Sequence, residues 1–380
     1  MLRRDFLKAI AATLVVYQSP LLATSSKVNK NQPKVVWLML KGALDPLHTL
    51  VPTFETALKD LRPNLYKSID GQCLALDKGF ALHPSLANLH QWYQNKQLLP
   101  ISAVYSGFNK RSHFDGQDYL ESGLAAPDLE NGWLARAIQV KNKQAISISQ
   151  STPISLRGAQ QQAKTWFPSY LPDAETETYQ ALQTLYQDNP LLLSRLQEGL
   201  AVDELLAEQS VINKNKGNFI NLSRSCGQLL AEKGTDCAML TLGGWDSHKA
   251  QAGQLKRQLS LLDKGLQALK VALAEQWDNT LVIVATEFGR TVRENGTRGT
   301  DHGTASALFL AGGKVNGGQV LGQWPGLADD QLYQQRDLQP TSNSFDWIAA
   351  ALQQHWQLNQ QQIKHVFPAH TPYKGKLFRT

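Results

Sequence analysis

The chain has 380 residues, of which 42% are hydrophobic and 18% are charged. This is an ordinary globular composition without a low-complexity block, and it allows one large or two modest hydrophobic cores. The net charge of +6 is mild and forms no basic stripe interleaved with aromatic residues, so nucleic-acid binding is not expected. The cysteines lack a metal-ligand spacing, and whether Cys226 and Cys237 pair in an oxidising compartment is left open by their spacing.

Residues 1–25 show the pattern of an export signal, with a basic start, an apolar middle and small residues near the end. The apolar run from Ala9 to Val16 is too short for a stable membrane span, and no permanent span is expected. Arg3 and Arg4 closely resemble the paired arginines of a twin-arginine signal, which implies export of the folded protein to the periplasm by the twin-arginine machinery. A basic amphipathic helix and an uncleaved anchor are the alternatives. Residues 26–33 are polar and are expected to form a linker.

Alternating strands and helices are predicted from residue 34 to residue 380, which we interpret as a single domain. Short apolar runs rich in β-branched residues predict buried strands at Lys34–Leu40, Leu98–Tyr105, Ala145–Ile148, Cys237–Leu242, Leu281–Ala285 and Ala305–Leu310. Helical spacing predicts helices after Pro84, from Ser112 to Gly123, and at Gly132–Val140, Gln251–Gln276 and Asn343–Trp356. The expected fold class is α/β, with a mostly parallel central sheet between helices and a helical insertion at about residues 174–232.

Polar side chains follow the ends of four predicted strands. They are Asp45 with His48, Ser112 at a helix start, Asp246 with His248, and Glu287 with the Asp301–His302 pair. Because parallel strands present their carboxyl ends at one edge of a sheet, these groups are candidates for a common site. Carboxylates and imidazoles are ligands of divalent ions. A serine at a helix N-terminus lies where backbone N–H groups favour an anion, and a nearby metal would make it a nucleophile.

Each of these residues also has an ordinary structural explanation. Ser112 is well placed to cap a helix, with an acidic residue three positions on to complete a capping box, and Asp246 is a possible cap of the helix that follows it. Glu287 is either a metal ligand or a partner for Arg290, and that arginine either holds an oxyanion or forms a salt bridge. His113 is expected to be a packing or hydrogen-bonding residue. The Asp-His-Gly sequence is also compatible with a simple turn.

Five motifs resemble those of the domain-of-unknown-function-1501 family. In chain order they are RSHFDGQDYLESG, NGWL, GWDSH, TEFGRTVRENG and TDHG. The resemblance extends from about Val35 to the C-terminal KGKLF, and the family is commonly exported by the twin-arginine route. More broadly, the order of strand ends and polar residues looks like the alkaline phosphatase and sulfatase superfamily. The resemblance therefore implies an alkaline-phosphatase-like α/β fold.

The superfamily resemblance also implies roles for individual residues. Its metal ligands fall on Asp45, Asp246, His248 and His302, and its nucleophile falls most nearly on Ser112. Glu287 stands where the superfamily has an aspartate, and Phe288, which cannot bind a metal, stands where it has a histidine. One divalent ion (zinc, calcium or manganese) is therefore expected rather than two, with Glu287 as a further candidate ligand and Arg290 as a candidate oxyanion-binding group.

The first motif departs from the family pattern. The family usually has R-G-G-x-D-G-L, whereas residues 41–47 read KGALDPL. Pro46 lacks a backbone donor and fixes φ, so a different loop geometry is expected beside Asp45.

These features predict an exported, metal-dependent hydrolase of a sulfate or phosphate ester, with a small anionic ester as substrate. The alternative is a non-catalytic periplasmic binding or assembly protein on a degenerate alkaline-phosphatase-like scaffold, which Phe288 favours. Its helical insertion would then form the partner surface. A metal-free Ser-His-Asp hydrolase is a third possibility, but the sequence has no G-x-S-x-G motif to support it.

Overall fold

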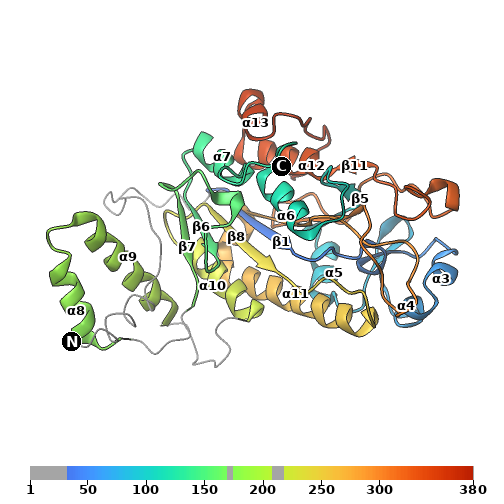
Figure 1. The fold of residues 1–380 in the computed structure, drawn as a ribbon, viewed down its shortest axis with the longest axis horizontal. Helices are drawn as coiled ribbons and strands as arrows, with labels where there is room; N and C mark the ends of the chain where they lie inside the picture. Colours follow the sequence, from blue (N-terminus) through green and yellow to red (C-terminus); the bar gives the residue numbers. More distant parts are fainter. Residues whose placement is uncertain (1–31, 169–173, 208–217, 380) are drawn as a thin grey trace.

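The computed structural model describes residues 32–168, 174–207 and 218–379 (Figure 1). The predicted export signal and all but the last two residues of the predicted linker lie outside the described residues. Within the described residues, no helix is long and apolar enough to cross a membrane.

The core of the described structure is an eight-stranded sheet with the strand order β11-β5-β10-β9-β1-β8-β6-β7. Its strands are β1 (Lys34–Leu40), β5 (Leu98–Tyr105), β6 (Ala145–Ile148), β7 (Ala163–Trp166), β8 (Cys237–Leu242), β9 (Thr280–Thr286), β10 (Ser306–Ala311) and β11 (Ser342–Asn343). Strand β10 is antiparallel to both of its neighbours, β5 and β9, whereas the other paired strands are parallel. The predicted α/β class with a mostly parallel sheet is confirmed.

Helices cover both faces of this sheet (Figure 1). One face carries α5 (Ala87–Gln94), α10 (Phe219–Ala231) and α11 (Gln251–Leu273), and the other carries α6 (His113–Ser122), α7 (Trp133–Val140), α12 (Ser344–Trp356) and α13 (Gln360–Val366). Side chains alternate between the two faces along a strand, so β1 contributes to both cores. Val36, Leu38 and Leu40 pack in the core with α11, whereas Val35, Trp37 and Met39 pack in the core with α7 and α12. Both faces of the strand are therefore buried.

The remaining elements lie at the two ends of the sheet. A small antiparallel sheet is formed by β2 (Leu50–Pro52), β4 (Phe80–Leu82) and β3 (Leu74–Ala75), near the short helices α2 (Pro46–Thr49), α3 (Leu58–Leu61) and α4 (Pro63–Lys67). Short 3-10 helices occur at Asp77–Gly79, Ile154–Leu156, Ala274–Asn279 and Asp329–Gln331. The helices α8 (Thr176–Leu185) and α9 (Pro190–Ala207) extend away from the main body (Figure 1).

The predicted bounds agree closely with the structure. Strands β1, β5, β6 and β8 have the predicted bounds, and β9 is one residue longer at each end. Helix α11 ends three residues before the predicted Gln276, because Ala274 has a φ of 47° and the chain continues as a 3-10 turn. In the predicted insertion, α10 packs on α11 as part of the main core. Cys226 and Cys237 are both buried and both free.

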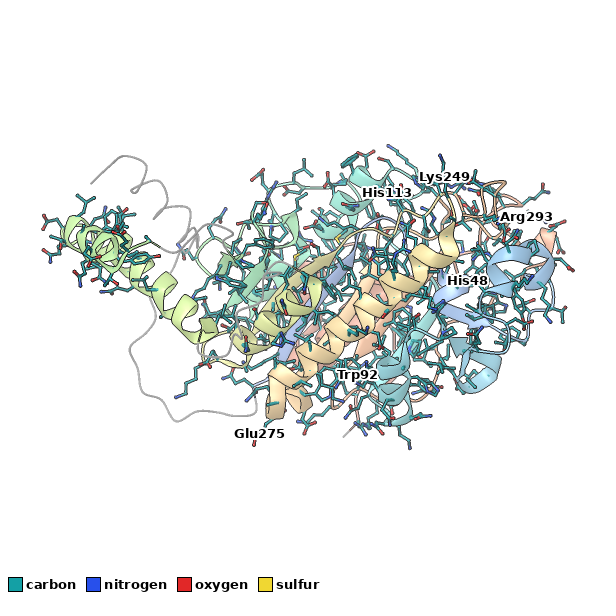
Figure 2. The ribbon with its side chains drawn as sticks, turned by 90° about the horizontal axis from the view of Figure 1, so that it is seen from below. His48, Trp92, His113, Lys249, Glu275 and Arg293 are labelled. Carbon is teal, nitrogen blue, oxygen red and sulfur yellow. The ribbon has the colours of Figure 1, made fainter. Side chains whose placement is uncertain are left out.

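The sheet gathers the polar segments at one edge. Strands β1, β5, β8 and β9 run in one direction, so their carboxyl ends share an edge. Strand β10 runs in the opposite direction and begins at that edge, which brings the preceding Asp301–His302 pair there as well. Figure 2 shows His113 and Lys249 near one end of α11, with Glu275 at the opposite end.

We predict that the leucine stripe of α11 stabilises the fold. Leu259 is fully buried, and a Leu259→Ala variant should lower the free energy of unfolding by about 2–5 kcal/mol, because it leaves a cavity in a closely packed core. Val271 on the same helix is 67% exposed, and a Val271→Ala variant should change it by less than about 0.5 kcal/mol. Denaturant unfolding measures both values, and equal effects would contradict the assignment of this stripe to the core.

Candidate metal centre

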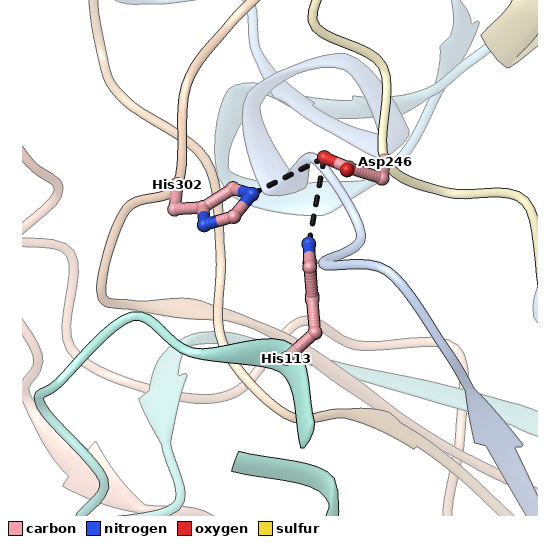
Figure 3. Close-up of side chains that lie close together, drawn as sticks. All are labelled: His113, Asp246 and His302. Atoms are coloured by element: carbon pink, nitrogen blue, oxygen red, sulfur yellow. Dashed lines mark hydrogen bonds and ion pairs between the residues drawn. The ribbon is translucent and has the colours of Figure 1, made fainter. Parts of the chain in front are cut away.

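Three histidines surround one carboxylate oxygen at this edge of the sheet. The Oδ1 atom of Asp246 lies 2.9 Å from His248 Nε2, 3.3 Å from His302 Nε2 and 3.4 Å from His113 Nε2. His113 begins α6, Asp246 and His248 follow β8, and His302 precedes β10. Figure 3 shows His113 and His302 pointing toward Asp246 from different segments.

The other ring nitrogen of each histidine faces an oxygen acceptor. The acceptors are Glu287 Oε1 for His113 (2.8 Å), the Arg111 carbonyl oxygen for His302 (2.9 Å) and Asp301 Oδ1 for His248 (3.0 Å). Carbonyl and ionised carboxylate oxygens accept hydrogen bonds, so each Nδ1 carries the proton that it donates. In the neutral rings, each Nε2 then presents a lone pair toward Asp246.

The arrangement fits a divalent metal ion. Ligand atoms of His113, Asp246 and His302 all lie within 4.8 Å of one another. The buried Nε2 of His113 has no hydrogen-bond partner among the described residues. A tetrahedral zinc ion with bonds of about 2.0–2.1 Å holds its ligand atoms about 3.3 Å apart, close to the separations between Asp246 and these imidazoles. A cation would therefore satisfy nitrogen lone pairs that the protein alone leaves facing one another.

His248 decides how many positions around such an ion are open. Its Nε2 lies 2.9 Å from Asp246 Oδ1 and 3.0 Å from His302 Nε2, which is also ligand spacing. Its side chain is 40% exposed, whereas that of His113 is 18% exposed. Structural zinc sites use four protein ligands, and catalytic sites use three and keep one position open. His248 is thus the side chain that would distinguish the two kinds of site, although the group of ligand atoms that lie within 4.8 Å of one another contains only His113, Asp246 and His302.

Arg290 lies against Asp246 from the protein interior. Its Nη1 donates to Asp246 Oδ1 at 2.7 Å, its Nε donates to Thr300 Oγ1 at 3.2 Å, and its Nη2 donates to the Thr300 carbonyl. Burial raises the pKa of Asp246, but the hydrogen bond and charge of Arg290 outweigh it and lower the pKa to about 2. Arg290 is fully buried, so in this arrangement it holds Asp246 and faces no solvent.

Glu287 contacts His113 on the side away from Asp246 and is not part of the three-residue group formed by His113, Asp246 and His302. It is fully buried and accepts hydrogen bonds from His113 Nδ1, from Gln117 Nε2 at 3.2 Å and from Thr286 Oγ1 at 2.8 Å. Burial raises its pKa, but these hydrogen bonds leave the pKa below its ordinary value. In turn, burial lowers the pKa of His113, and Glu287 outweighs that effect and raises it. The carboxylate therefore fixes the ring orientation of His113.

Gly42 brings the first-strand loop against the loop that carries Asp246. Its N–H donates to Glu287 Oε1 at 2.8 Å, and its φ is +117°. A Cβ atom at this position would lie 2.7 Å from the backbone nitrogen of Asp246, closer than real Cβ atoms approach. Only glycine fits this contact without a shift of the Asp246 loop.

Ser112 occupies the N-cap position of α6, as predicted, but the predicted capping box does not form. Its side chain makes no hydrogen bond to the first turn of this helix, whose residues are all described. Its carbonyl accepts the first helical bond, from Gly116, and Gly123 ends the helix with a φ of 69°. Ser112 stands in the chain between Arg111, which holds His302, and His113.

Asp45 lies apart from the three-residue group. It caps α2 through the N–H of Leu47 at 3.1 Å, and it pairs with the fully buried Arg62 at 2.6 Å. Burial raises the pKa of Asp45, but Arg62 outweighs it and the pKa is lowered. The expected change of loop geometry at Pro46 takes the form of a helix start, since Pro46 is the first residue of α2, where its fixed φ is compatible.

A chain of buried hydrogen bonds joins Asp45 to Asp246. Gln251 Nε2 donates to Asp45, and Gln251 Oε1 accepts from Thr300 Oγ1 at 2.6 Å. Thr300 in turn accepts from Arg290, which holds Asp246. Asp45 therefore supports the centre through other residues in this arrangement.

A family model described as "Protein of unknown function (DUF1501)" matches residues 110–367. The chain belongs to this family. The matched range contains His113, Asp246, His248 and His302, whereas Asp45 precedes it. No curated protein matches the chain.

Solved structures with a distant likeness include members of the superfamily named from the sequence. The C-terminal periplasmic domain of EcEptC from Escherichia coli, in complex with zinc, is 9% identical, with 77% of this chain and 76% of that chain covered and a TM-score of 0.40. A protein in the alkaline phosphatase superfamily from Vibrio parahaemolyticus is 11% identical (93% and 75% covered, TM-score 0.38). An alkaline phosphatase from the Antarctic bacterium TAB5 is 12% identical (77% and 95% covered, TM-score 0.36).

The family motifs contain most of the groups described above. The RSHFDGQDYLESG motif supplies His113, which was expected to be a packing or hydrogen-bonding residue and does contact Glu287. The GWDSH motif supplies Asp246 and His248. The sequence feature that could have identified His113 as a site residue is its position at a predicted helix start, next to Ser112. Arg62 lies in none of these motifs. It forms an ion pair with Asp45, which is 17 residues earlier in the chain, and no sequence pattern predicts this pair.

We predict that the pair of Arg62 and Asp45 is essential for stability. An Arg62→Met variant should lower the free energy of unfolding by about 3–5 kcal/mol, because it leaves the buried Asp45 carboxylate without its charge partner. Arg293 and Asp329 form an exposed pair at 2.7 Å, so Arg293→Met should cost less than about 1 kcal/mol. Denaturant unfolding at neutral pH compares the two variants, and a cost for Arg62→Met as small as the control would refute the prediction.

Proposed function

We propose that this protein is an exported, metal-dependent hydrolase of a sulfate or phosphate ester. The observation that carries the proposal is the convergence of three imidazole Nε2 atoms within 3.4 Å of one carboxylate oxygen, with every Nδ1 held by an acceptor. The substrate class comes from the sequence resemblance to the alkaline phosphatase and sulfatase superfamily. The twin-arginine pattern in residues 1–25 supports export to the periplasm.

The donor set favours one zinc ion over manganese or calcium, because imidazole nitrogen suits zinc, whereas manganese and calcium prefer oxygen ligands. His113, Asp246 and His302 would hold this ion. When bound, a divalent ion polarises an ester oxygen as a Lewis acid. Phe288 supports a single ion, since its ring is buried and stacks on His113 with 4.9 Å between centroids, where a second ligand would otherwise stand.

The other groups have roles that follow from their contacts. Arg290 keeps Asp246 ionised and oriented, and Glu287 keeps His113 in the tautomer with a free Nε2. Ser112 is the proposed nucleophile, since its hydroxyl does not cap α6. In the proposed step the serine oxygen bonds to the phosphorus or sulfur atom of the ester and the bond to the leaving alcohol breaks. The exposed His248 is the side chain proposed to take up the serine proton, and Asp301 holds its Nδ1 at 3.0 Å.

A second function is favoured by the same histidine. If His248 fills the fourth position, the site has three imidazoles and one carboxylate and is closed like a structural zinc site. The protein would then be a non-catalytic periplasmic binding or assembly protein that holds a metal. The distance of 3.0 Å between His248 Nε2 and His302 Nε2 supports this arrangement.

Metal content and hydrolysis test the proposal together. We expect the purified protein, reloaded with zinc or manganese, to bind one ion and to hydrolyse an aryl sulfate or an aryl phosphate. His113→Ala and His302→Ala should reduce metal affinity by at least tenfold, because each removes a ligand. His365→Ala, an exposed position on α13, should match the wild type in metal affinity and hydrolysis.

The possible results separate the two functions. Stoichiometric metal without hydrolysis of either ester class would favour the closed, non-catalytic site, and a His248→Ala variant would then still bind metal with one position open. A wild-type protein that binds no divalent ion under any loading condition would refute the hydrolase and the metal-holding form of the second function, and would leave a metal-free binding or assembly protein.

A further inference from the structure

We infer that Arg111 is a positioning residue that aims His302 at the metal centre through its backbone carbonyl, which its own side chain keeps in place. The inference rests on the proposed function, because it assigns a role within the same metal site. Arg111 is a non-glycine residue with a left-handed backbone, and its carbonyl contacts His302, one of the proposed metal ligands.

The backbone of Arg111 lies in the left-handed region, with a φ of 55°. An L-residue other than glycine rarely adopts this conformation, because its Cβ atom crowds the following carbonyl. In this conformation the Arg111 carbonyl oxygen lies 2.9 Å from His302 Nδ1. The strained residue thus supplies the acceptor that fixes the ring orientation and tautomer of a proposed metal ligand.

The Arg111 side chain is clamped by a buried carboxylate. Its Nε lies 3.1 Å and its Nη2 lies 2.7 Å from Asp337 Oδ2, and its Nη2 also donates to Gln334 Oε1 at 2.7 Å. Asp337 is fully buried and accepts a further hydrogen bond from Thr304 Oγ1 at 2.8 Å. Two guanidinium nitrogens thus donate to one carboxylate oxygen, and a third contact goes to Gln334, so these charge-assisted bonds resist rotation of the Arg111 side chain.

The same segment also holds the backbone of His302. Arg336, next to Asp337, donates from Nη2 to the His302 carbonyl oxygen at 2.8 Å. Thr291 pairs with Asp337 on one side, and its N–H donates to the Asp301 carbonyl at 2.9 Å on the other. Residues 336–337 therefore fix His302 twice, directly at its carbonyl and through Arg111 at its ring.

Loss of the clamp should release the strained backbone. A residue with a Cβ atom would leave the left-handed region, its carbonyl would turn away, and the His302 ring would lose its acceptor. Loss of a group that orients a metal-binding histidine typically weakens metal binding by 10- to 100-fold. Glycine adopts the left-handed region readily, so it should retain the carbonyl position better than alanine does.

The comparison of Arg111→Ala with Arg111→Gly therefore tests the inference. We expect the dissociation constant for zinc to rise about 10- to 100-fold in Arg111→Ala and clearly less in Arg111→Gly. Isothermal titration measures the affinity, and the absorption spectrum of the cobalt-loaded protein reports the ligand geometry. Arg157→Ala is the control, because Arg157 is half-exposed and pairs with the exposed Glu130 at 3.8 Å.

A merely structural role of Arg111 gives a different pattern. It would lower the thermal stability of the metal-free protein without any advantage of glycine over alanine in zinc affinity. Asp337→Asn provides a second test if an Arg111 variant does not fold. It weakens the clamp while it keeps an oxygen acceptor for Thr304, and it should also weaken zinc binding and alter the cobalt spectrum.

The outcomes separate this inference from the proposed function. A wild-type protein that binds no ion overturns both. A wild-type protein that binds zinc, with Arg111→Ala at wild-type affinity or with Arg111→Gly no better than Arg111→Ala, overturns this inference alone. Wild-type affinity in a folded Asp337→Asn variant would also overturn it.

Discussion

The site depends on how the charge of Asp246 is balanced. One oxygen of this carboxylate faces the buried Arg290 guanidinium at 2.7 Å and three imidazole nitrogens within 3.4 Å. Arg290 keeps the carboxylate ionised, and the acceptors behind the histidines turn their lone pairs toward it. Neutral imidazoles arranged in this way repel one another at 3.0 Å unless a proton or a cation lies between them. The repulsion between these lone pairs connects the buried Arg290 and Glu287 to the proposed metal, because their hydrogen bonds hold Asp246 and His113 in this arrangement.

The sheet topology makes that convergence possible. Parallel strands bring the loops that follow β1, β5, β8 and β9 to one edge of the sheet. A loop that precedes a strand lies at this edge only if that strand runs in the opposite direction. Strand β10 is the reversed strand, and His302 lies in the loop that precedes it. The supporting groups come from still further along the chain, since Asp337 holds the residue that holds His302. The centre is therefore assembled from segments more than 200 residues apart.

The sequence predicted the long elements well, because buried strands such as β1 and the leucine stripe of α11 carry a strong local pattern. It did not predict β2, β3, β4, β7 or β11, which are two to four residues long and give no periodic signal. At the site, position at a strand end was enough to select Asp246, His248 and His302. Position at a strand end could not distinguish candidate metal ligands from the residues that hold those ligands in place. Glu287 and Asp45 follow strands as ligands do, yet their partners, His113 and Arg62, are set by tertiary contacts. Their roles as ligands remain predictions that the proposed site does not use.

Diffraction from zinc-loaded crystals at the zinc absorption edge tests the central claim most directly. The account predicts one anomalous peak at about 2.0–2.2 Å from the Nε2 atoms of His113 and His302 and from a carboxylate oxygen of Asp246. It also predicts that each Nδ1 keeps the acceptor seen without metal. A zinc ion bound elsewhere, with Asp246 still held only by Arg290 and the imidazoles, would contradict the account.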